Sequence, residues 1–278
     1  MKKINRRSFL AAAGLTAAAL ALTACGGSAS STASSTASSA ASSEAASTSA
    51  AAELTTVEAG KLTMATNAAF PPYEMTTDAG EFEGIDIDTA KAIAEKLGLE
   101  LQIDDMDFDS ALMSVKHGKA DIVMAGVTVT DERKAVMDFS DSYATGIQSI
   151  IVPEGSDITS PDDLAGKKIG TQRGTTGYIY CSDDFGDDAV VAYDDGLTAV
   201  QALNNGQVDA VVIDNAPAKE FVAANPGLVI LDTSYAEEDY AIGLAKGSAL
   251  EDAVNAALEE LKADGTLQSI VDKYITAE

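Results

Sequence analysis

The chain alternates between short apolar runs and amphipathic stretches, which predicts strands interleaved with helices. Residues 61–66 form a strand candidate, and residues 99–103 alternate as a strand does. Two helical stripes of apolar residues precede Gly98 and Gly265, and glycine suits a helix C-terminus. The stripes are Ile87, Ala90, Ala94 and Leu97, and Leu250, Val254, Leu258 and Leu261. This alternation is typical of an α/β fold.

Two segments of the chain resemble each other. Residues 111–126 read ALMSVKHGKADIVMAG, and residues 199–214 read AVQALNNGQVDAVVID. Each predicts a helix, a glycine at its end, an aspartate three residues later (Asp121 or Asp209) and a buried strand. Two unrelated helix–strand units would give the same pattern. The interpretation we adopt is two similar α/β lobes.

The strands of this repeat end on polar or flexible positions. Gly126 and Asp214 each lie five residues beyond the shared aspartate. Ligands of open α/β sheets bind outside the carboxyl ends of the strands. Two such ends, one from each lobe, predict a cleft between the lobes.

The N-terminus reads as a lipoprotein signal. A cationic start with Lys2, Lys3, Arg6 and Arg7 precedes an uncharged run over residues 9–22, which is too short to span a bilayer. Small residues then lead to Cys25, the residue that would be acylated. We expect a signal peptide over 1–24, exported by the twin-arginine or the Sec route, and a lipid anchor at Cys25.

A low-complexity tether is expected to follow the anchor. Residues 28–52 are Ser, Ala and Thr except for Glu44, and such a segment cannot bury enough apolar surface to fold. We place the tether at 25–60. Its length suits the outer face of a Gram-positive cell membrane, although periplasmic lipoproteins also carry linkers.

The composition limits the partners. The 278 residues carry a formal charge of −26, and removal of the signal peptide removes four of the cations. This excess of acid argues against nucleic acid and against adhesion to anionic lipid. With Cys25 lipidated, Cys181 is the remaining thiol, so no intrachain disulfide is expected. We interpret it as a semi-buried residue without a redox role.

Three segments at predicted strand ends carry candidate chemistry. They are residues 66–74 (TNAAFPPYE), 125–133 (AGVTVTDER) and 174–177 (GTTG), the last expected to open a helix whose N–H groups attract an anion. Each segment alone is equally compatible with a turn, a helix cap or a solvated charge.

Enzymatic and metal sites are poorly supported. His117 is the sole histidine and lies at a helix end where exposure is expected. Asp105, Asp107 and Asp109 imitate a calcium loop, but Ser110 and Lys116 replace the glycine and glutamate that it requires. We therefore expect no catalytic residue, no metal and no cofactor.

Together these segments resemble the family 3 extracellular solute-binding proteins, the amino-acid receptors of ABC importers. The resemblance runs from about residue 61 to 274 and is strongest in AGVTVTDERKAVMDFSDSYATGIQSIIV and in FPPYE followed by GEFEGIDIDTAKAIAEKLG. It implies a two-lobed periplasmic-binding-protein fold of type II, with a ligand cleft between lobes joined by two crossover strands.

The resemblance also implies the site. Arg133 would pair with the ligand α-carboxylate, with Thr128 as a second donor and a backbone N–H of Thr175 or Thr176 completing the carboxylate site. Asp214 would pair with the α-ammonium. The Ala125–Gly126 segment would contribute the Gly126 carbonyl as a further acceptor.

Selectivity would come from Asn67, Phe70, Phe108 and Gln172, with the two rings stacked against the ligand. Many relatives carry an acid at the position of Asn67, and an unpaired ligand cation is costly to bury. We therefore expect a small, polar, uncharged L-amino acid. Glu74 would supply the missing anion if its side chain turned inward.

The sequence thus predicts a monomeric substrate-binding lipoprotein that closes over an amino acid and docks on an ABC permease. Lobe 1 is placed at 61–145 and 242–278 and lobe 2 at 146–241, with crossovers near residues 144–148 and 240–243. Gly146 and Gly243 are candidate hinges. The alternatives are a prephenate- or arogenate-type dehydratase on the same fold, which would need Glu74 as its acid, and a ligand sensor without transport.

Overall fold

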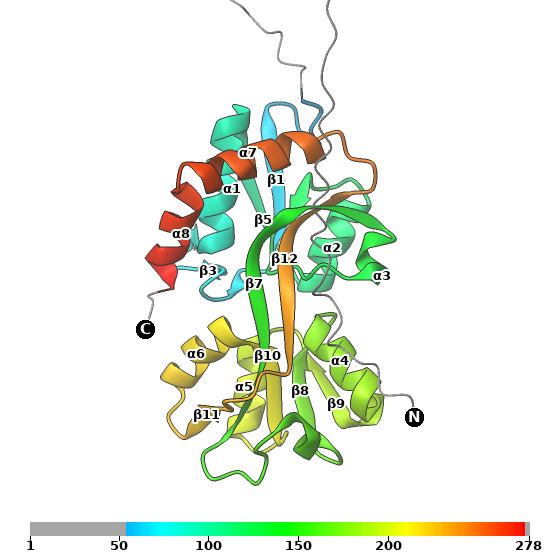
Figure 1. Ribbon diagram of the computed structural model, residues 1–278, viewed down its shortest axis with the longest axis vertical. Coiled ribbons are helices and arrows are strands. Elements are labelled where there is room, and N and C mark those ends of the chain that lie inside the picture. The colour runs from blue at the N-terminus through cyan, green and yellow to red at the C-terminus, as the bar shows by residue number, and fades with distance from the viewer. Residues whose placement is uncertain (1–53, 276–278) are drawn as a thin grey trace, which may run out of the picture. The chain divides into compact units, whose positions relative to one another are not determined.

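The computed structural model describes residues 54–275, which form two α/β lobes joined by two long strands (Figure 1). The predicted signal peptide, Cys25 and the Ser/Ala tract lie outside the described residues. Within them, no helix is both long enough and apolar enough to traverse a bilayer.

Lobe 1 takes its elements from both ends of the described chain. They are β1 (Lys61–Thr66), β2 (Ala69–Phe70), β3 (Glu74–Thr76), β4 (Phe82–Glu83), α1 (Ile85–Leu97), β5 (Glu100–Asp105), α2 (Phe108–Lys116), β6 (Ile122–Val123), α3 (Asp131–Lys134), α7 (Glu251–Ala263) and α8 (Thr266–Tyr274). Gly98 ends α1 with a left-handed φ of 69°, as predicted. Gly265 has a left-handed φ of 80° and follows the end of α7, also as predicted, and α8 begins directly after it.

Lobe 2 is built from a continuous stretch. Its elements are the 3-10 helix η1 (Pro161–Leu164), β8 (Ile169–Gln172), α4 (Thr176–Phe185), the 3-10 helix η2 (Asp187–Ala189), β9 (Val190–Tyr193), α5 (Gly196–Asn204), β10 (Ala210–Asp214), α6 (Asn215–Ala224) and β11 (Leu228–Ile230). The strands that join the lobes are β7 (Met137–Pro153) and β12 (Ala236–Ala245).

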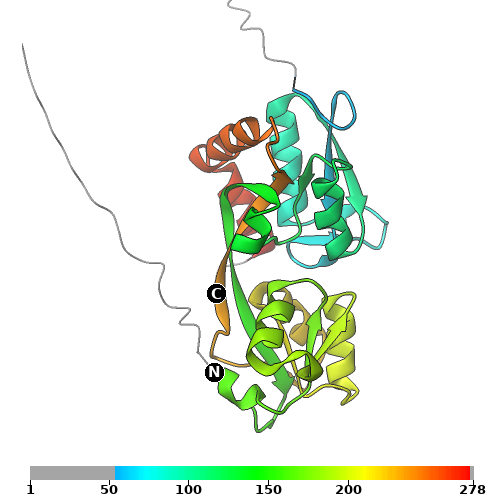
Figure 2. The same cartoon turned by 90° about the vertical axis from the view of Figure 1, so that its right-hand side faces the viewer.

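One sheet runs through both lobes in the order β5-β1-β6-β12-β7-β10-β8-β9, with β11 also paired to β7. The strands β5, β1 and β6 are parallel, and so are β10, β8 and β9. The antiparallel pair β7 and β12 lies between these two groups and runs side by side from lobe to lobe (Figure 2). Strands β2, β3 and β4 form a small second sheet in lobe 1.

Apolar residues are buried around these strands, and one cluster includes residues of both lobes, among them Leu62 and Val211. One cluster in lobe 1 includes Phe108 and Val123, and one in lobe 2 includes Ile150 and Val212. Cys181 belongs to the lobe 2 cluster and is 0% exposed, so it is fully buried rather than semi-buried as predicted. His117 lies exposed at the end of α2, as expected.

The pairing of β7 with β12 locates the crossing between lobes. Ala236 pairs with Gln148, and Tyr240 with Ala144, whereas Gly243 already pairs with Val123 of β6. The register therefore puts Gly243 inside the lobe 1 sheet, past the crossing that the sequence assigned to it. Gly146 lies within the crossing, and a Cβ there would come within 2.4 Å of the Tyr240 ring, so packing requires glycine.

The segment before β1 contacts lobe 1. Leu54 packs against the core, and the Val57 N–H donates to Asp121 Oδ1 at 2.8 Å. Residues 54–60 are thus held against the domain, whereas the sequence analysis placed them in the tether.

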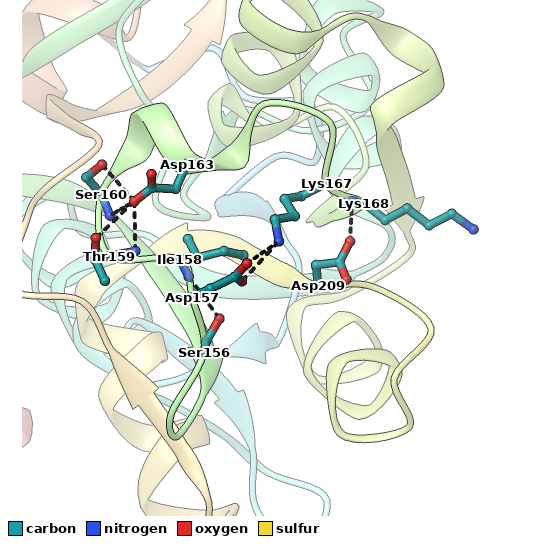
Figure 3. Close-up of polar contacts among 9 residues, drawn as sticks. All are labelled: Ser156, Asp157, Ile158, Thr159, Ser160, Asp163, Lys167, Lys168 and Asp209. Carbon is teal, nitrogen blue, oxygen red and sulfur yellow. Dashed lines mark hydrogen bonds and ion pairs between the residues drawn. The ribbon is translucent and has the colours of Figure 1, made fainter.

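The connection from β7 to β8 at the far end of lobe 2 is held by local polar contacts (Figure 3). Asp163 Oδ2 accepts four hydrogen bonds from Thr159 and Ser160, each 3.0 Å long. Lys167 pairs with Asp157, and the Lys168 N–H donates to Asp209 Oδ2 at 2.7 Å. These contacts fix the loop that leads into β8, the strand that carries Gln172 to the cleft.

Candidate functional site

One cavity lies where the two lobes and the crossover strands meet, with an empty volume of about 430 Å³ that includes space open to solvent. All eleven residues that the sequence assigned to ligand binding line it. They are Asn67, Phe70, Phe108, Ala125, Gly126, Thr128, Arg133, Gln172, Thr175, Thr176 and Asp214. The cavity is also lined by residues outside that assignment, namely Glu74, Gln148, Val212, Ile213 and Tyr240.

Arg133 reaches this cavity from a helix of four residues. The Thr130 hydroxyl caps that helix by accepting from the Arg133 N–H at 3.2 Å. The guanidinium donates to the carbonyl of Thr128 at 2.8 Å and to that of Gly174 in lobe 2 at 3.1 Å, and it lies 5.3 Å from the centre of the Phe108 ring. A guanidinium carries five N–H donors, so these bonds orient it and leave others for a carboxylate.

The Arg133 side chain is buried, with 9% of the residue exposed. Burial lowers the pKa of its guanidinium, and the negative charge of Glu238 opposes that shift. A buried cation without a bound anion is unfavourable, and an anionic ligand group relieves this cost. The geometry and the charge of Arg133 both suit a ligand carboxylate.

A hydrogen-bonded chain crosses from lobe 2 to the crossover strand β12. The hydroxyls of Thr176 and Thr128 lie 3.3 Å apart, and Thr128 Oγ1 donates to Glu238 Oε2 at 3.0 Å. Gln148 Nε2 donates to the same oxygen at 3.0 Å. Because a carboxylate only accepts, the Thr128 hydroxyl presents an acceptor to its other neighbours. This orientation differs from the carboxylate donor that the sequence analysis expected at Thr128.

Asp214 ends β10 and caps α6. Its two oxygens accept from the N–H groups of Ala216 at 2.9 Å and of Ile147 in β7 at 2.8 Å. Burial raises the pKa of Asp214 to about 6, and the two backbone hydrogen bonds oppose the rise. The carboxyl is thus fixed in position, and a cation placed beside it would stabilise its ionised form.

The loop before α4 opens a helix at the cavity, as predicted. Thr175 caps α4 by accepting from the Tyr178 N–H at 3.4 Å, and Thr176 is the first helical residue. The N–H groups of a first helical turn attract anions, so this end of the cavity favours the same group as Arg133.

The two amides expected to read the ligand side chain contact each other. Gln172 Nε2 in lobe 2 donates to Asn67 Oδ1 in lobe 1 at 2.8 Å, and Asn67 Nδ2 donates to the Met106 carbonyl at 3.0 Å. These bonds hold the lobes together at one wall of the cavity.

Glu74 lies on the cavity lining and is 0% exposed. Neither of its carboxyl oxygens has a hydrogen-bond donor among the described residues. Burial, followed by the charge of Asp86, raises the pKa of Glu74 well above its usual range. The sequence analysis left Glu74 out of the binding site but noted that it would supply an anion if its side chain turned inward. The structure places Glu74 on the cavity lining.

A cleft between two α/β lobes, lined by a fixed cation and a fixed anion, defines a solute-binding protein. The chain belongs to the bacterial extracellular solute-binding proteins of family 3, whose family model matches residues 62–277. This membership confirms the predicted family and the two-lobed fold.

The relatives are named as binding proteins. The "Probable histidine-binding protein" of Neisseria gonorrhoeae is 33% identical over 283 residues, 99% of this chain and 98% of that protein. The arginine-binding extracellular protein ArtP of Bacillus subtilis strain 168 is 34% identical over 230 residues, 78% of this chain and 87% of that protein. The solved structure of "An ancestral arginine-binding protein bound to arginine" is 43% identical with a TM-score of 0.74, and the match covers 78% of this chain and 98% of that one. The relatives support a binding protein rather than an enzyme.

Proposed function

We propose that this protein captures a cationic L-amino acid such as arginine between its lobes and delivers it to the membrane subunits of an ABC importer. The observation that carries the proposal is that Arg133 and Asp214 face one cavity from different lobes. A zwitterion offers each of them its opposite charge, so closure is favoured by a ligand that touches both lobes at once.

The main-chain end of the ligand would be held as the sequence analysis expected. Arg133 and the N-terminal turn of α4 would bind the carboxylate, while Asp214 and the Gly126 carbonyl would bind the ammonium. Thr128 would join the ammonium side, because its hydroxyl proton is directed to Glu238. We also propose the lobe boundaries that the sequence analysis gave. The hinge would lie on β7 and β12, between the pair Gln148 and Ala236 and the pair Phe139 and Gly243.

The side-chain end favours a cation over the uncharged ligand first expected. That expectation rested on Asn67, whose amide is bonded to Gln172 and Met106. Glu74 instead places a buried carboxyl on the lining with no donor of its own. A ligand guanidinium or ammonium would satisfy it, and the Phe70 and Phe108 rings on the same lining suit a planar guanidinium. The names of the arginine-binding relatives support the same ligand class.

The compartment follows from the family and from the N-terminus. Family 3 proteins are extracellular, and we propose that Cys25 is acylated and holds the protein at the outer face of the membrane. Mass spectrometry of the membrane-associated protein should find an acylated Cys25 as its first residue. An unmodified Met1 start on that protein would refute the anchor, and Cys25→Ala should abolish lipid attachment.

Titration calorimetry with arginine, lysine, histidine, glutamine and serine tests the ligand class. Arginine or lysine should bind most tightly, and ligand at 100 times its dissociation constant should add about 2.7 kcal/mol to the free energy of unfolding. Tighter binding of glutamine or serine than of both cations would refute a cationic ligand and support the uncharged ligand that the sequence analysis expected. Absence of binding by any amino acid would refute the function.

A further inference from the structure

Two buried carboxyl groups lie next to each other at the cavity, and one of them, Glu74, belongs to its lining. Glu74, at the start of β3, and Asp86, in the first turn of α1, are each 0% exposed and within hydrogen-bonding range of each other. Among residues 54–275, no Lys or Arg forms an ion pair with either group. Two adjacent buried carboxylates without a cation are strongly unfavourable, so such pairs hold a proton.

The surroundings indicate which group carries the proton. Asp86 Oδ2 accepts from the Gly126 N–H at 3.0 Å, and the N-terminus of α1 favours a negative charge there. Glu74 receives no donor on either oxygen, and Asp86 Oδ1 also lacks one. A proton on Glu74 directed at Asp86 Oδ1 would satisfy an atom of each group. Asp86 is then the anion and Glu74 the neutral acid.

The other groups around the pair do not compensate its charge. Asp105 and Asp214 add negative charge near Glu74 and favour its protonated form. Tyr73 and Tyr143, whose own pKa values are raised by burial, stay neutral beside the pair, and the nearby Tyr143 hydroxyl favours the ionised form of Asp86. Tyr240, which packs edge-on against Tyr73, is neutral for the same reason.

We propose that the unliganded cleft holds one proton between Glu74 and Asp86, and that the cationic side chain of the ligand displaces it. The proposal rests on the proposed function, since it requires a ligand cation that reaches Glu74. Before binding, the pair carries one negative charge and one proton. After binding, the two carboxylates and the ligand cation again sum to one negative charge, and the proton passes to the solvent.

This exchange would let the site distinguish a charged ligand side chain from an uncharged one of the same shape. Arginine and citrulline have nearly the same shape, but the ureido group of citrulline is uncharged. A neutral side chain cannot replace the proton, so citrulline should bind to the protonated pair without releasing it. Arginine affinity should rise with pH by up to tenfold per unit while the pair remains protonated in the free protein.

Calorimetry of the full chain at pH 7.5, in buffers of different ionisation enthalpy, counts the protons released. At this pH Asp214, whose pKa lies at about 6, is already ionised and contributes little. We expect about one proton released per L-arginine and none per L-citrulline. The exposed Glu81→Gln should behave as the wild type.

Two variants assign the proton to the pair. In Glu74→Gln, arginine should release no proton and lose its preference over citrulline. In Asp86→Asn, removal of the neighbouring anion lowers the pKa of Glu74, so arginine should release a smaller fraction of a proton. Tight arginine binding by the wild type with no proton release would overturn this proposal and leave the proposed function intact. Failure of arginine to bind while glutamine binds would overturn the cationic ligand and this proposal together.

Discussion

The helix–strand unit of lobe 1 and that of lobe 2 use the same construction but end in different chemistry. Gly118 after α2 and Gly206 after α5 have φ values of 65° and 67°. Asp121 and Asp209 then each form two hydrogen bonds with the backbone of one residue in a neighbouring segment, Thr63 or Lys168. The carboxylate accepts from the N–H of Thr63 at 2.8 Å or of Lys168 at 2.7 Å, and the aspartate N–H donates to the same residue's carbonyl at 2.9 or 2.8 Å.

The two units diverge at the carboxyl ends of their strands. In lobe 2 the strand ends on Asp214, whose oxygens are both satisfied by backbone N–H groups. In lobe 1 it leads to Gly126, whose N–H bonds Asp86 of the unsatisfied Glu74–Asp86 pair. The shared construction aligns the strand ends, and the residues that follow decide the ligand. In the proposed complex, the charged side chain on the ammonium is therefore Asp214 of lobe 2, whereas Glu74 of lobe 1 faces the ligand side chain.

The largest expected effect is the loss of arginine affinity on removal of the Arg133 side chain. Arg133→Ala should lower the affinity for arginine by about 2–5 kcal/mol, because a buried charge partner of the carboxylate is lost. Calorimetry measures the loss, and thermal unfolding checks that the variant folds. Arg173→Ala is the matched control, since that side chain is 56% exposed and forms a surface ion pair. Equal affinities of the two variants would contradict the role of Arg133.

The second effect concerns the pH dependence of the ligand-free protein. The pKa of Glu74 is raised by burial, so the folded state binds a proton more tightly than the unfolded state. This contribution to stability is complete below the unfolded pKa and is lost as pH rises toward the folded pKa. Relative to Glu74→Gln, the wild type should therefore lose up to about 1.4 kcal/mol per pH unit above pH 5. Parallel stability curves of the wild type and this variant would show that Glu74 does not titrate as described.

The smallest expected effects concern Asp121 and Asp209, which should stabilise the fold without contributing to ligand binding. Asp121 is 6% exposed and also accepts from Val57, whereas Asp209 is exposed. Asp121→Asn should lower the free energy of unfolding by about 1.5 kcal/mol, and Asp209→Asn by less than about 0.5 kcal/mol. Chemical denaturation measures both, and the arginine affinity of each folded variant should match the wild type. A large affinity loss in either would mean that these aspartates belong to the site.

Much of this arrangement could be predicted because it is local in sequence. Gly98 marks a helix end, the repeat locates two strand ends, and the family-like segments carry the residues that line the cavity. Tyr240 and Gln148, which line the cavity, and Glu238, which bonds Thr128, were missed because the register of β7 with β12 places them, and no short motif encodes that register. The inward turn of Glu74 was missed for a related reason, since it depends on the packing of β3 over α1 and Asp86.

Arg133 is proposed to bind the ligand carboxylate and Asp214 the ligand ammonium, and three ligands test this assignment directly. Agmatine lacks the carboxylate of arginine, and 5-guanidinopentanoate lacks its ammonium. By calorimetry the wild type should bind L-arginine more tightly than either. Arg133→Ala should remove the preference over agmatine alone, and Asp214→Asn should remove the preference over 5-guanidinopentanoate alone. If each variant lost both preferences equally, or neither, the assignment of Arg133 to the carboxylate and of Asp214 to the ammonium would be contradicted.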